Sequence, residues 1–324
     1  MQEYQEQNKT QHPIVSIIMT TKDRPILLAR ALESVVTQSY QAWHLFLVNN
    51  GGERQSFTQT LKHYQNVFDN RITIIETGDD VPRPAALNMA LKKCAGEFIA
   101  VHDDDDSWHP KFLAKTVAFL QKAKNKNFIG VRTRFEILHE EIRHNKIFDC
   151  GRDDGGWLFV PHLSYSMLHY MNPIPPISML LRRSVVQAAG FLQESQTPPQ
   201  AEWDYFLKLV QQGDIATLQQ CFAYYHIRLY TLATSPYANR LRTDHYKDME
   251  NYTHHNNELI RETLENNPHL SGLFSSLAEI NFQLHQRLAD LDRKLDHICH
   301  KKCPIIQRVK EEWGHFKRKR LKIR

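Results

Sequence analysis

The stretch EFIAVHDDDDSWHP, residues 97–110, decides the fold of this chain. Its first half is apolar and rich in β-prone residues, which is typical of a strand buried on both faces of a sheet. Four consecutive aspartates then follow: Asp103, Asp104, Asp105 and Asp106. Neighbouring carboxylates raise one another's pKa, so a fold accepts four of them only where they are solvated or neutralised by a partner. The stretch therefore predicts a strand with a ligand site at its carboxyl end.

The segments before this stretch alternate between short apolar runs and helical patterns. Further strands are expected at IVSIIM (14–19), HLFLV (44–48) and RITIIE (71–76). Helices are expected after each of them, near residues 25–36, 57–64 and 84–94. This order predicts a Rossmann-like, doubly wound and mainly parallel sheet. Ligands bind beyond the carboxyl ends of such strands, so the loops TTKDR, NNGG and DDDDSW are expected to converge on one crevice.

From about Val131 the regular alternation of short strands and helices ends. A longer alternating strand, a Pro-rich loop, a helix around AEWDYFLKL and a strand at CFAYYHIRLYT are expected in turn. The pattern predicts a flexible polar arm at 1–12 and one domain at 13–235, whose halves cover about 13–130 and 131–235. A helical extension with a basic amphipathic tail is expected at 236–324.

The composition indicates a globular protein whose excess positive charge lies at one end. The chain has 324 residues, 41% of them hydrophobic, and a formal net charge of +5, with ten Lys or Arg against two Glu from residue 301 onward. Five scattered cysteines argue for a reducing compartment. The N-terminus does not resemble a signal peptide, and no run approaches the roughly 20 apolar residues of a membrane span. A cytoplasmic protein is expected, either free or peripheral on the inner face of the cell membrane.

The basic end, RVKEEWGHFKRKRLKIR, predicts contact with an anionic membrane surface. Cationic side chains beside aromatic ones suit the interfacial layer of a bilayer, where each charge contributes about 1 kcal/mol. A plain solvated tail and nonspecific nucleic-acid binding are the alternatives. No nucleic-acid partner is expected, because no recognised nucleic-acid module accompanies the tail. Leucines near heptad spacing between Leu284 and Leu295 predict either a homodimer seam or a helix packed on the main domain.

Several motifs in order resemble the family-2 glycosyltransferases of the GT-A fold, over residues 13–232. They are VSIIMTTKDRPILLARALESVVTQSY, LVNNGG, RPAALNMALKKCAGEFIAVHDDDDSWHP, NPIPPISMLLRR, AEWDYFLKL and AYYHIR. The resemblance implies a GT-A fold and an inverting transferase that moves a sugar from a nucleotide-sugar donor to a saccharide or lipid-linked acceptor. It also implies a place in bacterial surface polysaccharide or lipopolysaccharide synthesis.

The chemistry of such a reaction agrees with the aspartate run. A nucleoside diphosphate leaves with developing negative charge, which a hard divalent cation such as Mn2+ or Mg2+ can neutralise. Carboxylates two residues apart in an extended segment point to the same side, which selects Asp103 and Asp105. Asp105 is the first choice for direct metal ligand, and Asp103 is placed nearer the ribose or the metal's waters. Asp104 and Asp106 are expected to support the loop.

The resemblance assigns nucleotide-sugar contacts to further residues by position. They are Thr21, Asp23, Arg24, Asn49, Asn50, Arg83, Asn88, Asp103, Asp104 and Arg228. Asn49 and Asn50 stand where the family usually has aspartates, and because an amide both donates and accepts, the identity of the base stays open. Arg83 is displaced toward the N-terminus from the family's Arg-Asn pair. A guanidinium suits phosphate well, so a phosphate or base contact is expected for it.

An inverting reaction needs a base that takes the proton of the acceptor hydroxyl. Aligning AEWDYFL on its tryptophan puts Glu202 at the family's base position, with Asp204 as the competitor. The alternative role of Asp204 is compensation of the helix dipole. Arg228 is expected to contact the diphosphate, and His226 is either a metal ligand or a structural histidine.

Two other classes compete with a transferase. A sugar nucleotidyltransferase should carry a Gly-rich phosphate loop after its first strand, and MTTKDRP contains no glycine. A non-catalytic nucleotide- or carbohydrate-binding protein derived from a transferase is favoured by Asn49 and Asn50. The paired metal carboxylates and the acidic candidate base oppose it.

Overall fold

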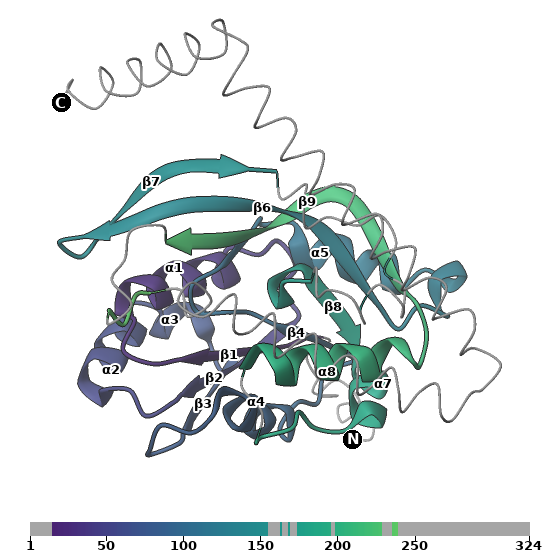
Figure 1. The fold of residues 1–324 in the computed structure, drawn as a ribbon, viewed down its shortest axis with the longest axis horizontal. Helices are drawn as coiled ribbons and strands as arrows, with labels where there is room; N and C mark the ends of the chain where they lie inside the picture. The colour runs from purple at the N-terminus through teal and green to yellow at the C-terminus, as the bar shows by residue number, and fades with distance from the viewer. Residues whose placement is uncertain are drawn as a thin grey trace, which may run out of the picture. The chain divides into compact units, whose positions relative to one another are not determined.

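A nine-stranded sheet forms the centre of the computed structural model, which describes residues 15–154, 163, 168, 174–195, 198–228 and 235–238. Eight strands follow the order β3-β2-β1-β4-β8-β6-β9-β5, and β7 pairs with β6 beside this path (Figure 1). The predicted polar arm lies outside the described residues. So do the helical extension, its leucine stripe and the basic tail, apart from 236–238.

The first half of the chain forms the predicted parallel layer. Strands β1 (Val15–Thr21), β2 (Trp43–Asn49), β3 (Ile72–Glu76) and β4 (Phe98–Val101) pair in parallel. They alternate with helices α1 (Pro25–Val36), α2 (Arg54–Lys62), α3 (Gln65–Phe68) and α4 (Arg83–Leu91). Pro25 opens α1, where its missing N–H removes no helical hydrogen bond. The doubly wound prediction is confirmed.

Strand β1 is apolar at nearly every position because both of its faces are covered. Val15, Ile17 and Met19 belong to the core that includes α1, and all three are fully buried. Ile18 points to the opposite face, toward Leu87 of α4. Successive side chains of a strand alternate between faces, so a doubly covered strand reads as a continuous apolar run.

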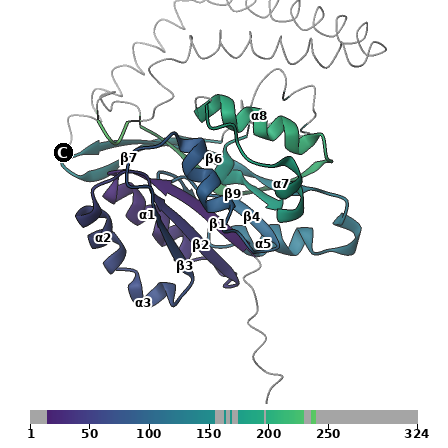
Figure 2. The ribbon, with the colours of Figure 1, turned by 90° about the horizontal axis from the view of Figure 1, so that it is seen from below.

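The second half extends the sheet with antiparallel and long strands. Its elements are β5 (Ser107–Trp108), α5 (Phe112–Leu120), η1 (Ala123–Asn125), β6 (Gly130–Arg143), β7 (Lys146–Asp153), η2 (Pro176–Ser178), β8 (Met179–Arg182), α7 (Arg183–Ala189), α8 (Pro198–Val210) and β9 (Ile215–Arg228). Helices α7 and α8 lie together, away from α2 and α3 (Figure 2). Within this described part, no helix has the length and apolar character that crossing a membrane requires.

The long strands β6 and β9 carry polar residues toward the end of the parallel layer where the aspartates lie. They run parallel to each other, with Glu140 opposite Arg228 and Leu138 opposite His226 (Figure 1). Strand β5, immediately after the aspartates, pairs antiparallel with β9, with Ser107 opposite Tyr224. The aspartate loop is thereby held between β4 and β9.

Candidate active site

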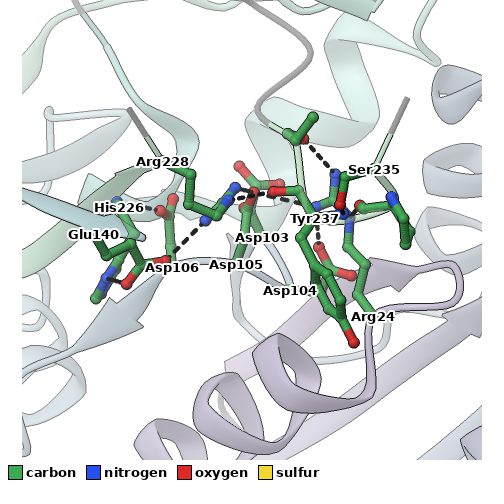
Figure 3. A network of polar contacts seen from close by, with 12 residues as sticks. Arg24, Asp103, Asp104, Asp105, Asp106, Glu140, His226, Arg228, Ser235 and Tyr237 are labelled. Atoms are coloured by element: carbon green, nitrogen blue, oxygen red, sulfur yellow. Dashed lines mark hydrogen bonds and ion pairs between the residues drawn. The ribbon is translucent and has the colours of Figure 1, made fainter. Parts of the chain in front are cut away.

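Asp104 and Asp105 share one guanidinium group, that of Arg24 (Figure 3). Arg24 Nη1 lies 3.0 Å from Asp104 Oδ1 and 3.1 Å from Asp105 Oδ2. Thr21 Oγ1 donates to Asp104 Oδ2 at 2.7 Å, and Arg228 donates to Asp105 Oδ2. Burial raises the pKa of Asp104 despite Arg24. Burial acts on Asp105 too, but Arg228 and Arg24 outweigh it and lower the pKa of that carboxyl, so Asp105 is the one held ionised.

Asp106 turns away from this pair and into the protein. Its side chain is fully buried, and its Oδ1 accepts from the backbone N–H of His226 at 2.9 Å. Its Oδ2 has no hydrogen-bond partner among the described residues. Burial, followed by repulsion from Asp105 and Asp103, raises the pKa of Asp106 well above the usual value. Four adjacent carboxyl groups are tolerated because they diverge to different partners and this one favours its neutral form.

Arg83, the first residue of α4, joins Asp103 to α8. Its Nη2 lies 2.5 Å from Asp103 Oδ1, and its Nε lies 2.7 Å from Glu202 Oε1. Burial, followed by repulsion from Asp103, raises the pKa of Glu202 although Arg83 opposes the shift. A carboxylate with a raised pKa is a better proton acceptor than an ordinary one. Asp204 lies two positions farther along α8, about 200° around the helix axis, so it does not share the position of Glu202.

An apolar cavity of about 50 Å³ adjoins Glu202. Its lining comes from β1, β4, β8 and the helices α4, α7 and α8, and Glu202 is the one charged residue in it. Leu87, Tyr205 and Phe206 are among the residues around it. This apolar surrounding is the physical source of the burial that raises the pKa of Glu202.

The loops after β1 and β2 are tied together by side-chain hydrogen bonds. Asp23 adopts a positive φ of 53°, which is uncommon for a residue other than glycine, and its Oδ1 accepts from Glu53 N at 2.6 Å. Asn49 Nδ2 donates to Glu76 Oε2 at 2.8 Å and to Gly52 O at 3.2 Å. Asn49 therefore holds the loop after β2 against the end of β3.

Asn50 is closed onto the loop after β3. Its Nδ2 donates to Val81 O at 2.8 Å, and its Oδ1 accepts from Val81 N at 3.1 Å. The amides of Asn49 and Asn50 thus serve the loops themselves. The sequence predicts that these side chains contact the base of the nucleotide. Such a contact would have to replace one of these hydrogen bonds or use a remaining lone pair.

The structure does not bring Asn88 to the aspartates. Its side chain is buried, donates to Leu192 O and Glu194 Oε1 at 2.9 Å each, and accepts from Leu192 N at 3.0 Å. The carboxamide therefore fastens α4 to the 192–194 loop. The nucleotide contact expected for Asn88 stays a prediction, and in this arrangement both polar atoms of the side chain serve that loop.

Both ring nitrogens of His226 contact neighbouring side chains. One ring nitrogen, Nε2, lies 2.8 Å from Ser107 Oγ, and the other, Nδ1, lies 3.0 Å from Glu140 Oε2. The ring is buried, which lowers its pKa and favours the neutral form. Because both nitrogens are engaged, this arrangement favours the alternative of a structural histidine, and the metal-ligand role stays a prediction.

Two residues of this network, Arg30 and Glu140, are not among the site residues that the sequence predicts. Glu140 is 3% exposed, although simple alternation from Phe135 and Ile137 would turn it away from the buried side. The pairing of β6 with β7 changes register at this point, but the extra residue, Cys150, is on β7. Glu140 instead meets buried partners from α1 and β9, namely Arg30, His226 and Arg228. The sequence carries no clear signal of this meeting.

A short turn after β9 lies against the arginines (Figure 3). Arg24 Nε donates to Pro236 O at 2.8 Å and its Nη2 to Ala238 O at 3.4 Å. Arg228 Nε donates to Tyr237 O at 2.6 Å. Three carbonyl groups of one turn therefore accept from the two guanidinium groups that also hold Asp105.

The family of the chain follows from comparison with known proteins. Residues 16–185 match the family described as Glycosyl transferase family 2. The chain belongs to this family. This family-2 member is 33% identical to EpsE of Bacillus subtilis and 32% identical to WcaA of Escherichia coli, which is named for colanic acid biosynthesis. Each match covers 118 residues, 36% of this chain and 42% of the relative. An uncharacterized Haemophilus influenzae glycosyltransferase is 24% identical over 76% of both chains.

Solved structures agree with the predicted GT-A fold of this family-2 chain. TarS of S. aureus matches with a TM-score of 0.51 at 15% identity, over 66% of this chain and 36% of TarS. The 1–349 fragment of TarS in complex with UDP-GlcNAc matches with a TM-score of 0.50 at 16% identity, over 79% and 72% of the two chains. At these identities the likeness shows the fold alone. The predicted family and fold class are confirmed.

The residues at the aspartate loop fit the divalent cation that the fold implies. Asp103 Oδ2 and Asp105 Oδ1 have no hydrogen-bond partner in the described part of the chain, and their side chains are 15% and 17% exposed. The described residues contain no cluster of three or more candidate ligands, so an ion here would be held by one or two carboxylates. That is the usual arrangement for Mg2+ bound together with substrate phosphates.

Proposed function

We propose that this chain is an inverting, metal-dependent glycosyltransferase. It would move a sugar from a nucleotide-sugar donor to a saccharide or lipid-linked acceptor in bacterial surface polysaccharide or lipopolysaccharide synthesis. The observation that carries the proposal is the juxtaposition of the paired carboxylates Asp103 and Asp105 with a third carboxylate, Glu202, through Arg83. The names of EpsE and WcaA support the polysaccharide class.

Asp105, with Asp103 beside it, would hold the divalent cation, Mn2+ or Mg2+. When bound, the cation neutralises the charge that develops on the diphosphate leaving group. Arg24 and Arg228 already lie on Asp105 and add fixed positive charge at the same place. Preorganised charge of this kind stabilises the transition state more than the ground state, because the negative charge grows as the glycosidic bond breaks.

Glu202 would accept the proton of the acceptor hydroxyl. Its raised pKa matches that task, and its attachment to Arg83 keeps it close to Asp103. Arg83 would also orient the donor, since one guanidinium group can contact a carboxylate and a phosphate together. We assign no catalytic step to Asp204.

The loops after β1 and β2 would hold the nucleotide. Thr21, Asp23 and the amides of Asn49 and Asn50 shape the loops where a nucleotide would lie. The basic tail would hold the enzyme at an anionic membrane surface near a lipid-linked acceptor, and the helices before it would form a homodimer seam or pack on the main domain. Both proposals rest on the sequence.

Calorimetric titration with UDP, GDP and dTDP, each with and without Mn2+, tests the proposal. We expect one nucleotide to bind in a metal-dependent manner and Asp105→Ala to abolish that dependence. Glu141→Gln, which changes a half-buried acid on β6 paired with the exposed Arg143, is the matched control. Binding that ignores both metal and mutation would favour a nucleotide-binding protein without transferase activity. Hydrolysis of the matching nucleotide sugar, lost in Glu202→Gln with binding retained, would complete the assignment.

A further inference from the structure

A second cluster of charges lies behind the aspartate loop, and Glu140 is its centre. The carboxylate accepts hydrogen bonds from three side chains on two elements, Arg30 of α1 and His226 and Arg228 of β9. Arg30 Nη1 donates to Oε2 at 2.5 Å and Arg30 Nη2 to Oε1 at 3.2 Å. Arg228 Nη1 donates to Oε1 at 3.0 Å, and His226 Nδ1 lies 3.0 Å from Oε2 (Figure 3). A carboxylate with four donors at this depth is rigidly oriented.

Both arginines of the cluster also reach Asp105. Arg30 Nη2 donates to the backbone carbonyl of Asp105 at 2.5 Å. Arg228 Nη2 donates to the carboxylate Oδ2 of the same residue. Glu140 is therefore linked to Asp105 through two arginines. Arg30 contacts the main chain of Asp105, and Arg228 contacts its side chain.

The ion pairs of Arg228 explain how the charge of Glu140 affects Asp105. Arg228 has no exposed side-chain surface, and Glu140 and Asp105 are the two carboxylates that pair with it in the described residues. If Glu140 lost its charge, Asp105 would be the remaining carboxylate of that pair, and Arg228 would hold it more strongly. A cation that needs Asp105 would then compete with a tighter ion pair.

We propose that Glu140 is a positioning residue for the cation and diphosphate site. It shares Arg228 with Asp105 and anchors Arg30 on the Asp105 main chain, so that Asp105 keeps one oxygen, Oδ1, available in a fixed orientation. This inference rests on the proposed function, because it gives Asp105 the role of cation ligand. Glu140 itself touches neither donor nor acceptor in this proposal.

The test compares Mn2+ dependence in Glu140→Gln and in the matched control Glu141→Gln. Glu141 is the next residue of β6 and pairs with the exposed Arg143. The probe is whichever of UDP, GDP and dTDP the wild type binds, titrated by calorimetry at a series of MnCl2 concentrations. We expect the half-saturating Mn2+ concentration to rise at least tenfold in Glu140→Gln. At saturating Mn2+, nucleotide affinity should return to within threefold of wild type, and Glu141→Gln should match wild type throughout.

Arg30→Lys covers the case in which Glu140→Gln does not fold. An ammonium group cannot span Glu140 and the Asp105 carbonyl as a guanidinium fork does, so we expect a rise in half-saturating Mn2+ of the same sign. A folded Glu140→Gln or Arg30→Lys with wild-type Mn2+ dependence would overturn the positioning role. A loss of binding amplitude with unchanged half-saturating Mn2+ would also overturn it, since the protein that still binds would then have the Mn2+ dependence of the wild type. A wild type that binds none of the three nucleotides would instead overturn the proposed function, and this inference with it.

Discussion

Asp103 and Glu202 are held together by a single guanidinium group, that of Arg83. The first residue lies two positions after β4, and the second lies on α8 in the other half of the chain. In the proposed enzyme these are a donor-side carboxylate and the acceptor-side base. The Arg83 side chain would therefore fix the position of the donor site relative to the acceptor site.

Replacing Arg83 with lysine should separate these two carboxylates. Lysine keeps the charge but offers one nitrogen, so it cannot donate to both groups in the same geometry. We expect kcat for donor hydrolysis or transfer to fall by about 10²-fold, which is the usual effect of a misplacement of about 1 Å. Steady-state kinetics of the wild type and Arg83→Lys would measure it. Arg143→Lys, at an exposed arginine, is the control. A kcat for Arg83→Lys within threefold of the wild-type value would contradict the bridging role.

Glu140 should also stabilise the protein in a pH-dependent way. Burial would raise the pKa of Glu140, but hydrogen bonds from His226 and Arg30 outweigh it and lower the pKa to about 2, from 4.5. A depressed carboxyl pKa gives stability that is present above the unfolded pKa and lost as pH falls through the folded one. The wild type should therefore exceed Glu140→Gln in free energy of unfolding by about 3 kcal/mol at pH 7, and this difference should shrink between pH 4.5 and about 2.

Urea unfolding of both proteins at several pH values would measure that difference. Titrating groups outside the Glu140 network contribute equally to the two proteins and cancel in the comparison. A gap between wild type and Glu140→Gln that stays constant from pH 7 down to pH 3 would show that the charge of Glu140 is not what stabilises the fold.

The sequence is most informative where a residue's role follows from its place along a strand. Apolar runs predicted the parallel layer, and the strand before the aspartates placed their loop at the carboxyl end of β4. Glu140 could not be found this way, because its burial departs from the alternation of Phe135 and Ile137 and depends on Arg30, His226 and Arg228, which are distant in the sequence. The use of the Asn50 amide by Val81 was also unpredictable, since that pair depends on how two loops meet.

Gly51 and Gly78 lie in the loops after β2 and β3, and replacing each with alanine tests how closely these loops approach. Gly51 and Gly78 both have positive φ, at 70° and 79°, so alanine is strained at either position by about 1 kcal/mol. A Cβ on Gly51 would in addition lie 2.5 Å from Asp80 N and 2.7 Å from Asp79 C, whereas one on Gly78 would meet nothing within 4 Å. We expect Gly51→Ala to lower both Tm and nucleotide affinity, and Gly78→Ala to lower Tm slightly with affinity retained. Equal effects on Tm and on calorimetric affinity would show that the close approach of the two loops does not matter.

Asparagine at Asp105 and at Asp106 should have opposite consequences although the two residues are adjacent. Arg228 and Arg24 lower the pKa of Asp105, so its negative charge is part of the site, and Asp105→Asn should reduce metal-dependent donor hydrolysis by at least about 10²-fold. Burial raises the pKa of Asp106 well above the usual value, so its neutral carboxyl resembles an amide that can still accept from His226 N. Asp106→Asn should therefore keep Tm within a few degrees and hydrolysis within threefold of wild type. If Asp106→Asn instead lost as much hydrolysis as Asp105→Asn while remaining folded, Asp106 would have to be ionised and the division of roles within the aspartate run would be wrong.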